Sequence, residues 1–144
     1  MNGEKSLFNW VIHFAANRLS VTFSKSSAVF LKLNHQKLDV YSASLGLVFV
    51  CYKFSMTLPS EKKFGMSSQI RRAALSVHLN IAEGASRKSV VERRRYYEIA
   101  RGSIVEIDAA LDVANELGYT KDQDISDLSK AMIRYFQVLS GMLR

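Results

Sequence analysis

The sequence contains one cysteine, one proline and seven glycines in 144 residues. A single cysteine, Cys51, cannot form a disulfide within the chain and suits a reducing cytoplasm, where we expect the protein to reside. One proline, Pro59, and few glycines argue against a turn-rich β fold and favour long, uninterrupted helices. Because 48% of the residues are apolar and only 23% are charged, the chain has enough apolar surface for one folded domain with a sizeable core.

Long apolar runs and catalytic motifs are also missing. The longest uncharged run, residues 40–52, is shorter than the roughly 20 residues that cross a bilayer, so we expect no membrane contact. No Gly-rich phosphate loop, metalloprotease motif or Cys/His metal spacing occurs, so we expect neither an enzyme nor a cofactor. One carboxylate row recurs every four residues, and it is either a divalent-metal site or, more simply, a solvated face: Asp108, Asp112 and Glu116.

Apolar periodicity predicts four helices, over residues 37–56, 67–83, 89–118 and 121–143. Their ends carry recognisable signals. We expect Pro59, Gly84 and Gly118 to stop the first three helices. Two capping boxes are expected to start the last two helices: Ser89 with Glu92, and Thr120 with Gln123.

Each predicted helix has an apolar stripe for a common core. The first helix has two such faces: Leu38, Tyr41, Leu45, Val48, Phe49, Tyr52 and Met56, and Val40, Leu47, Val50, Cys51 and Phe54. The stripe of the second helix is Ile70, Ala73, Ala74, Val77 and Ile81, and a spare face holds Leu75, Leu79 and Ala82. The third and fourth stripes are Tyr96, Ala100, Ser103, Ile104, Ile107, Leu111 and Ala114, and Ile125, Leu128, Met132, Tyr135, Phe136, Leu139 and Leu143. The small residues Ala100, Gly102 and Ser103 predict that another helix approaches the third one closely.

These helices and their short connections predict an all-α fold, an antiparallel up-and-down four-helix bundle. We assign residues 35–144 to this bundle and residues 1–34 to an appended segment of unassigned structure. Two helices have a spare apolar face, which predicts association with a partner and most simply with further copies of the chain.

Positive charge is concentrated in the middle of the chain. Residues 61–101 hold ten Lys/Arg against four Asp/Glu, whereas residues 102–144 hold four against seven. A basic half suggests an anionic partner, nucleic acid first. The candidate phosphate-binding residues are Arg71, Arg72, Arg87, Lys88, Arg93, Arg94, Arg95 and Arg101.

Two tyrosines adjoin this basic set. Tyr96 and Tyr97 could stack on an unpaired base. The alternative is that Tyr96 belongs to the core and that Arg94, Glu98 and Arg101 form surface ion pairs. Both interpretations remain open from the sequence.

Several short motifs follow one another in an ordered series: Phe-Gly (64–65), Ser-Gln-Ile-Arg-Arg-Ala (68–73), Asn-Ile-Ala-Glu-Gly (80–84), Arg-Lys-Ser (87–89) and Ala-Arg-Gly-Ser (100–103). In this series residues 36–143 resemble the four-helix bundle proteins named for 23S rRNA intervening sequences. The resemblance implies a ring-like homo-oligomer, with a pentamer expected, and a role with RNA. It also extends to the accessory proteins of diversity-generating retroelements, which implies a reverse transcriptase as a partner. His78 stands where the family often has a proline, so a kink in the second helix is not expected.

Three functions therefore remain open from the sequence. The first is a non-enzymatic nucleic-acid-binding oligomer, in which RNA is the favoured ligand and Asn80, Glu83, Gly84 and Ser103 serve packing between helices or subunits. The second is a structural homo-oligomer that docks a protein partner without nucleic acid. The third is a metal-dependent nuclease built on the carboxylate row.

Overall fold

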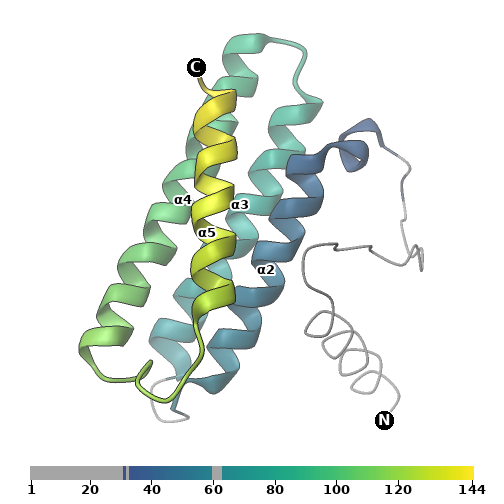
Figure 1. Ribbon diagram of the computed structural model, residues 1–144. Coiled ribbons are helices and arrows are strands. Elements are labelled where there is room, and N and C mark those ends of the chain that lie inside the picture. Colours follow the sequence, from purple (N-terminus) through teal and green to yellow (C-terminus); the bar gives the residue numbers. More distant parts are fainter. Residues whose placement is uncertain (1–30, 32, 60–62) are drawn as a thin grey trace. The chain divides into compact units, whose positions relative to one another are not determined.

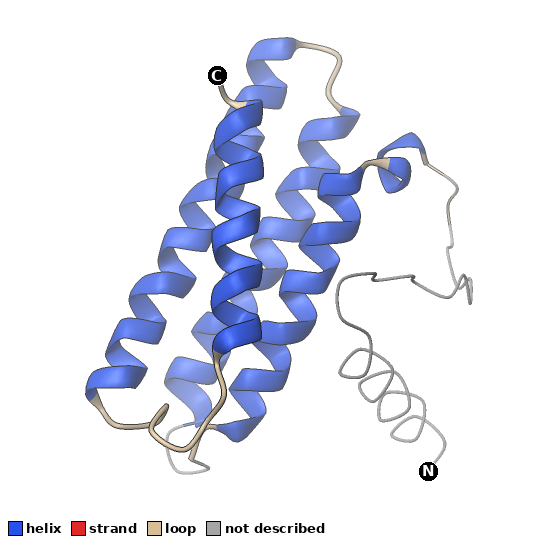
Figure 2. Cartoon of the chain, viewed as in Figure 1, coloured by secondary structure: helices blue, strands red, loops and turns tan. Residues whose placement is uncertain are grey.

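The computed structural model describes residues 31, 33–59 and 63–144, and these residues form helices and connections without a strand (Figures 1 and 2). A short 3-10 turn, η1 (Asn34–Lys37), precedes α2 (Asp39–Thr57), and a π-helical turn, η3 (Lys63–Ser67), leads into α3 (Ser68–Ser86). The chain continues with α4 (Val90–Glu116) and α5 (Ser126–Met142). The predictions of an all-α fold and of four helices are confirmed. Of the predicted appended segment, residues 1–30 and 32 lie outside the described residues.

Residues 32–144 form one compact unit in which α3 is the central helix. Helix α3 packs most extensively on α4 and next on α2, while α2 also packs on α5. The α4–α5 contact is the sparsest of the four. Figure 1 shows the carboxyl terminus at the end of the bundle where α3 connects to α4.

Helix α2 has the two apolar faces that its sequence predicts, and only one of them is in the core. Val40, Leu47, Cys51 and Phe54 are buried. The other face is only partly covered, since Leu38, Tyr52 and Met56 are 39%, 37% and 60% exposed and the other four residues are half-buried: Tyr41, Leu45, Val48 and Phe49. By length and composition alone α2 could cross a membrane, which the short uncharged run 40–52 did not suggest. Core helices of bundles meet the same criterion.

In α3 the predicted core stripe is confirmed, because all five of its residues are buried. The predicted stop at Gly84 is wrong. The helix continues to Ser86 and ends at Arg87, whose backbone is extended. Gly84 is instead buried against α4, where a Cβ atom would lie 2.7 Å from Cε1 of Tyr97. Its missing side chain therefore allows the two helices to approach closely.

Helix α4 begins and ends close to its predicted bounds. The Ser89 hydroxyl accepts a hydrogen bond from the amide of Glu92 at 3.4 Å. At the other end Gly118 has a positive φ of 76°. The amides of Gly118 and Tyr119 donate to the carbonyls of Asn115 and Ala114, both at 2.9 Å, which is the Schellman pattern.

Two details of the predicted α4 stripe are corrected. The tyrosine in the core is Tyr97, which is 5% exposed, whereas Tyr96 is only half-buried. The close helix contact predicted for the small residues is found at two of them, since Ala100 and Ser103 are buried and the Ser103 hydroxyl lies 2.9 Å from the Ser76 hydroxyl of α3, but not at Gly102. Gly102 is exposed, and a Cβ atom there would meet nothing within 4 Å.

Helix α5 starts at Ser126, later than residue 121, because the predicted capping box does not form. The Thr120 hydroxyl donates to Oδ1 of Asn115 at 2.7 Å, and the side-chain amide of Gln123 donates to the carbonyl of Tyr119 at 2.8 Å. Both side chains thus serve the turn after α4. The α5 stripe is buried as predicted at Leu128, Met132, Tyr135, Leu139 and Leu143, while Phe136 is 40% exposed and Ile125 is half-buried.

Polar contacts also join α2 to α3. The Ser44 hydroxyl lies 2.6 Å from the carbonyl of Tyr41, to which it donates, and 2.7 Å from Nδ1 of His78. The contact with His78 joins α2 to α3 across 34 residues of sequence. The imidazole also lies beside the Tyr41 ring, at a centroid distance of 4.5 Å.

Substitution of Gly84 should destabilise the fold. In Gly84→Ala the new methyl group would overlap the buried Tyr97 ring. Crowding of this kind costs about 1–3 kcal/mol, and the gain of about 1 kcal/mol in helix propensity offsets it only in part. Urea denaturation measures the difference. Gly46→Ala is the matched control, since a Cβ there meets nothing within 4 Å and should be neutral or stabilising. A Gly84→Ala variant as stable as Gly46→Ala would contradict the assigned contact.

Protonation of His78 should also destabilise the fold. Burial first, and the charge of His35 second, lower the pKa of His78 below its ordinary value. Between the two pKa values the unfolded chain binds a proton that the folded chain does not. Stability should therefore decrease as the pH falls through about 6.5, the ordinary pKa of histidine. Urea midpoints above and below this pH measure the decrease, and His78→Gln should remove most of it. An unchanged pH dependence in that variant would show that other groups cause it.

Candidate nucleic-acid interface

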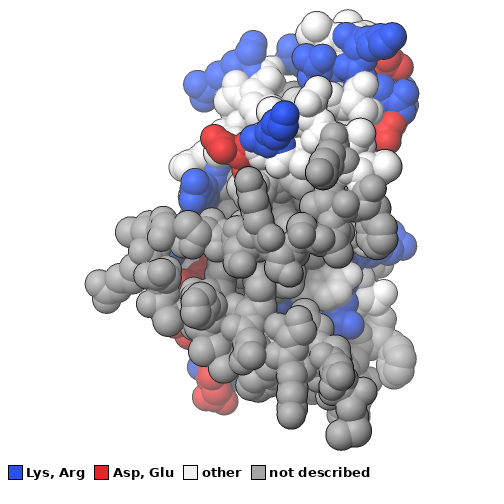
Figure 3. Space-filling view, turned by 90° about the vertical axis from the view of Figure 1, so that its right-hand side faces the viewer, with Lys and Arg blue, Asp and Glu red and all other residues white. Residues whose placement is uncertain are grey.

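Five of the predicted basic residues gather at the connection from α3 to α4. Arg87 and Lys88 follow the end of α3, and Arg93, Arg94 and Arg95 lie in the first two turns of α4. Figure 3 shows Lys and Arg side chains gathered at the top of the molecule, where Figure 1 places this connection. We call these five residues the basic connection.

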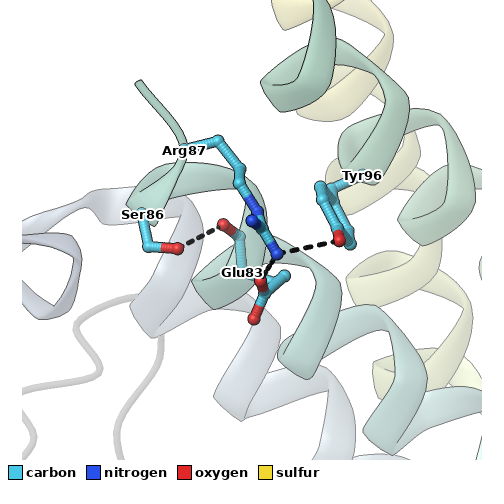
Figure 4. A network of polar contacts seen from close by, with 4 residues as sticks. All are labelled: Glu83, Ser86, Arg87 and Tyr96. Atoms are coloured by element: carbon cyan, nitrogen blue, oxygen red, sulfur yellow. Dashed lines mark hydrogen bonds and ion pairs between the residues drawn. The ribbon is translucent and has the colours of Figure 1, made fainter. Parts of the chain in front are cut away.

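Arg87 is held inside the basic connection by its neighbours (Figure 4). Its Nη2 forms an ion pair with the Glu83 carboxylate and donates to the Tyr96 hydroxyl at 3.0 Å. The guanidinium also lies 5.0 Å from the centre of the Tyr96 ring. Although desolvation opposes the charged form, Glu83 and Tyr96 together raise the pKa of Arg87. Since Glu83 neutralises its charge, Arg87 holds the connection in place more than it attracts an anion.

This network was not predicted from the sequence as a unit. The four-residue spacing of Glu83 and Arg87 on one helix is a sufficient signal for the ion pair. Nothing in the sequence indicates that Tyr96 reaches the same guanidinium, because that contact depends on how α4 folds back onto α3.

The side chains of the other four members of the basic connection differ in the contacts that they make within the chain. Arg93 donates to the carbonyl of Arg87 at 3.0 Å and so ties α4 to the end of α3. Arg94 makes a long contact of 3.5 Å with Glu98, and both side chains are more than half exposed. The side chains of Lys88 and Arg95 are exposed and form no hydrogen bond or ion pair with the rest of the described chain. Lys88, Arg94 and Arg95 are therefore the residues available to an anion.

The remaining three candidates lie elsewhere. Arg71 and Arg72 are near the start of α3, roughly 22 Å along the helix from Arg87 at 1.5 Å per residue. Arg71 is held by α2, with its Nε 2.7 Å from the Ser55 hydroxyl and its guanidinium 5.3 Å from the Tyr52 ring. Arg72 lines a shallow cavity of about 410 Å³ between α3 and α4. Arg101 is half-buried near the middle of α4. The eight candidates thus do not form one patch.

The two tyrosines differ in how accessible they are to a base. Tyr97 is buried against Gly84, and burial raises the pKa of its hydroxyl. The hypothesis that Tyr97 stacks on a base is therefore wrong, whereas Arg87 lies over one face of the half-buried Tyr96 ring. The basic connection can therefore contact phosphates, and at most one of its two tyrosines is accessible to an unpaired base.

The carboxylate row lies exposed along the outer side of α4, with Asp108, Asp112 and Glu116 all open to solvent. Within the described residues, no group of three or more His, Cys, Asp or Glu side chains is placed to hold a metal ion. The cysteine Cys51 is buried. Burial raises the pKa of its thiol to about 12, so little of the reactive thiolate forms.

Together these features define a class: a small all-helical protein with a basic connection between its two most closely packed helices. The chain belongs to the 23S rRNA-intervening sequence protein family, whose sequence profile matches residues 36–141. It is also similar to a crystal structure of a protein of unknown function from the S23 ribosomal protein family of Bacteroides thetaiotaomicron. That similarity has a TM-score of 0.65 at 22% identity and covers 73% of this chain and 98% of the other. No match is found among curated proteins.

The two neighbouring cations Arg87 and Lys88 should differ in their effect on stability. Arg87→Ala should lower the melting temperature because it leaves the Glu83 carboxylate and the Tyr96 hydroxyl without their shared partner. Lys88→Ala removes the same charge one residue later and should leave the melting temperature unchanged. Thermal denaturation followed by circular dichroism tests both variants. Equal shifts would indicate a general effect of charge rather than a local network.

Proposed function

We propose that this protein is a non-enzymatic, oligomeric RNA-binding accessory protein. The observation that carries the proposal is the basic connection, in which Lys88, Arg94 and Arg95 are exposed and little neutralised. Membership of the 23S rRNA-intervening sequence protein family is compatible with an association with RNA.

In this proposal the basic connection binds the phosphate backbone. The first amides of α4 point out of the helix start, where the helix dipole also favours an anion. Lys88 and Arg94 flank this start and supply the charge. Because Tyr97 is buried and Arg87 occupies one face of Tyr96, the favoured ligand is structured RNA recognised through its backbone, with little sequence preference.

We further propose that the four helices form an antiparallel up-and-down bundle and that several bundles assemble into a homo-oligomer, with a pentameric ring as the form that the family resemblance implies. The exposed apolar faces of α2 and α3 support self-association, since Met56 and Leu79 are 60% and 55% exposed. An oligomer would present several basic connections to one RNA, which strengthens weak individual contacts. A reverse transcriptase is the protein partner that the resemblance suggests.

A second candidate function rests on the same apolar faces. A structural oligomer that docks a protein partner needs the exposed residues of α2 and α3 but not the basic connection. The two functions separate in a single experiment, because only RNA binding depends on Lys88 and Arg94.

Binding to a structured RNA should weaken when the basic connection loses charge. Lys88→Ala/Arg94→Ala removes two phosphate contacts, so the slope of log K against log salt should fall by roughly two. Fluorescence anisotropy with a labelled hairpin RNA and a DNA duplex, across a salt series, measures affinity and slope. The control Lys130→Ala/Arg134→Ala removes the same charge from two exposed positions of α5 and should bind normally. Wild-type protein that ignores both nucleic acids at low salt would overturn the proposal and favour the protein-docking function.

A further inference from the structure

The ion pair between Arg87 and Glu83 lies within the surface that we assign to RNA (Figure 4). Glu83 is in the last turn of α3, and its carboxylate holds Nη2 of the arginine that directly precedes Lys88. The same Nη2 donates to the hydroxyl of Tyr96 in the second turn of α4. A carboxylate and a phosphate present similar anionic oxygens to a guanidinium, so Glu83 and an RNA phosphate compete for Arg87.

The ion pair has the features of a contact that exchanges readily. It joins one guanidinium nitrogen, Nη2, to one carboxylate oxygen, Oε1, whereas the strong pairs of arginine with a carboxylate have two parallel bonds. The side chains of Arg87 and Glu83 are 36% and 45% exposed, and ion pairs this open to water contribute little to stability. An incoming phosphate can therefore displace the carboxylate at small cost.

The ion pair also leaves part of the Arg87 guanidinium unsatisfied. Its Nε is shielded from solvent and has no hydrogen-bond partner among the described residues. A shielded donor without a partner raises the free energy of the folded chain. When the guanidinium turns from Glu83 towards the solvent, Nε becomes open to water or to a phosphate oxygen. The arrangement in the chain without RNA is therefore not the one that satisfies Arg87 best.

We propose that Arg87 exchanges the Glu83 carboxylate for an RNA phosphate when RNA binds, so that Glu83 is an internal competitor of RNA. This inference rests on the proposed function, since it concerns the same surface. It adds Arg87 to the phosphate contacts and makes Glu83 a residue that sets their affinity. The apparent affinity falls with the fraction of molecules in which the ion pair is formed, and for a pair this exposed the reduction is about two- to sixfold.

Removal of the competing charge should tighten RNA binding in the full-length protein. Glu83→Gln keeps the size of the side chain and should lower the dissociation constant of a labelled hairpin RNA about two- to sixfold more than the control Glu92→Gln does. Glu92 lies in the first turn of α4, is exposed and makes no ion pair with the described residues. The control therefore removes the same charge without releasing Arg87, and glutamine is also a capping-box residue. Equal effects of the two variants would overturn the exchange.

The salt dependence of binding tests whether Arg87 reaches a phosphate. Arg87→Gln removes one phosphate contact, so the slope of log K against log salt should fall by roughly one. In this background Glu83→Gln should tighten binding no more than Glu92→Gln does, because the competitor has lost its object. An unchanged slope in Arg87→Gln would show that the ion pair persists in the complex, which contradicts the exchange. Circular dichroism at the assay temperature shows whether each variant is folded.

Nuclear magnetic resonance follows the exchange in the wild-type protein. The Nε–H signal of Arg87, assigned through the backbone of the same residue, should shift when the hairpin RNA is added at low salt. Bound RNA with an unmoved signal would overturn the exchange and leave the proposed function standing. Wild-type protein that binds no RNA at low salt would overturn both.

Discussion

The rest of the structure depends on the close packing of α3 on α4, in which Gly84 faces the ring of Tyr97. The missing side chain lets a large aromatic ring fill the space between the two most extensively packed helices. It also brings the start of α4 against the end of α3, so that Tyr96 and Arg93 reach Arg87. The geometry of the basic connection therefore depends on core packing, through the uncharged contact between Gly84 and Tyr97.

Much of this fold could be predicted from the sequence, because the buried stripes repeat at helical spacing. The errors arose where a local signal competed with a tertiary contact. Gly84 resembles a helix stop, yet it serves packing, and Thr120 and Gln123 have the spacing of a capping box but bond to the preceding turn. Tyr96 and Tyr97 are adjacent, and periodicity alone did not identify which of them enters the core.

The candidate site was predictable to the extent that its residues are neighbours in sequence. Lys88, Arg94 and Arg95 come together because a short turn joins α3 to α4. Arg71 and Arg72 are basic too, but they lie at the opposite end of α3 from the basic connection. Each residue of a helix adds about 1.5 Å to the distance between its ends. The neutralisation of Arg87 depends on Glu83, from its own helix, and on Tyr96, from the next one, and the second of these is visible only in three dimensions.

One buried hydrogen bond links distant parts of the chain: the hydroxyl of Tyr135 in α5 donates to the carbonyl of Val40 in α2 at 2.9 Å, across a separation of 95 residues. During synthesis, the first turns of α2 leave the ribosome long before Tyr135 does. The core side of these turns therefore lacks its α5 partner while α3 and α4 are still being made. A chaperone that shields the apolar faces of α2 during this interval would act on a helix that is translated before the other three. That helix gains its last packing partner only when α5 is complete.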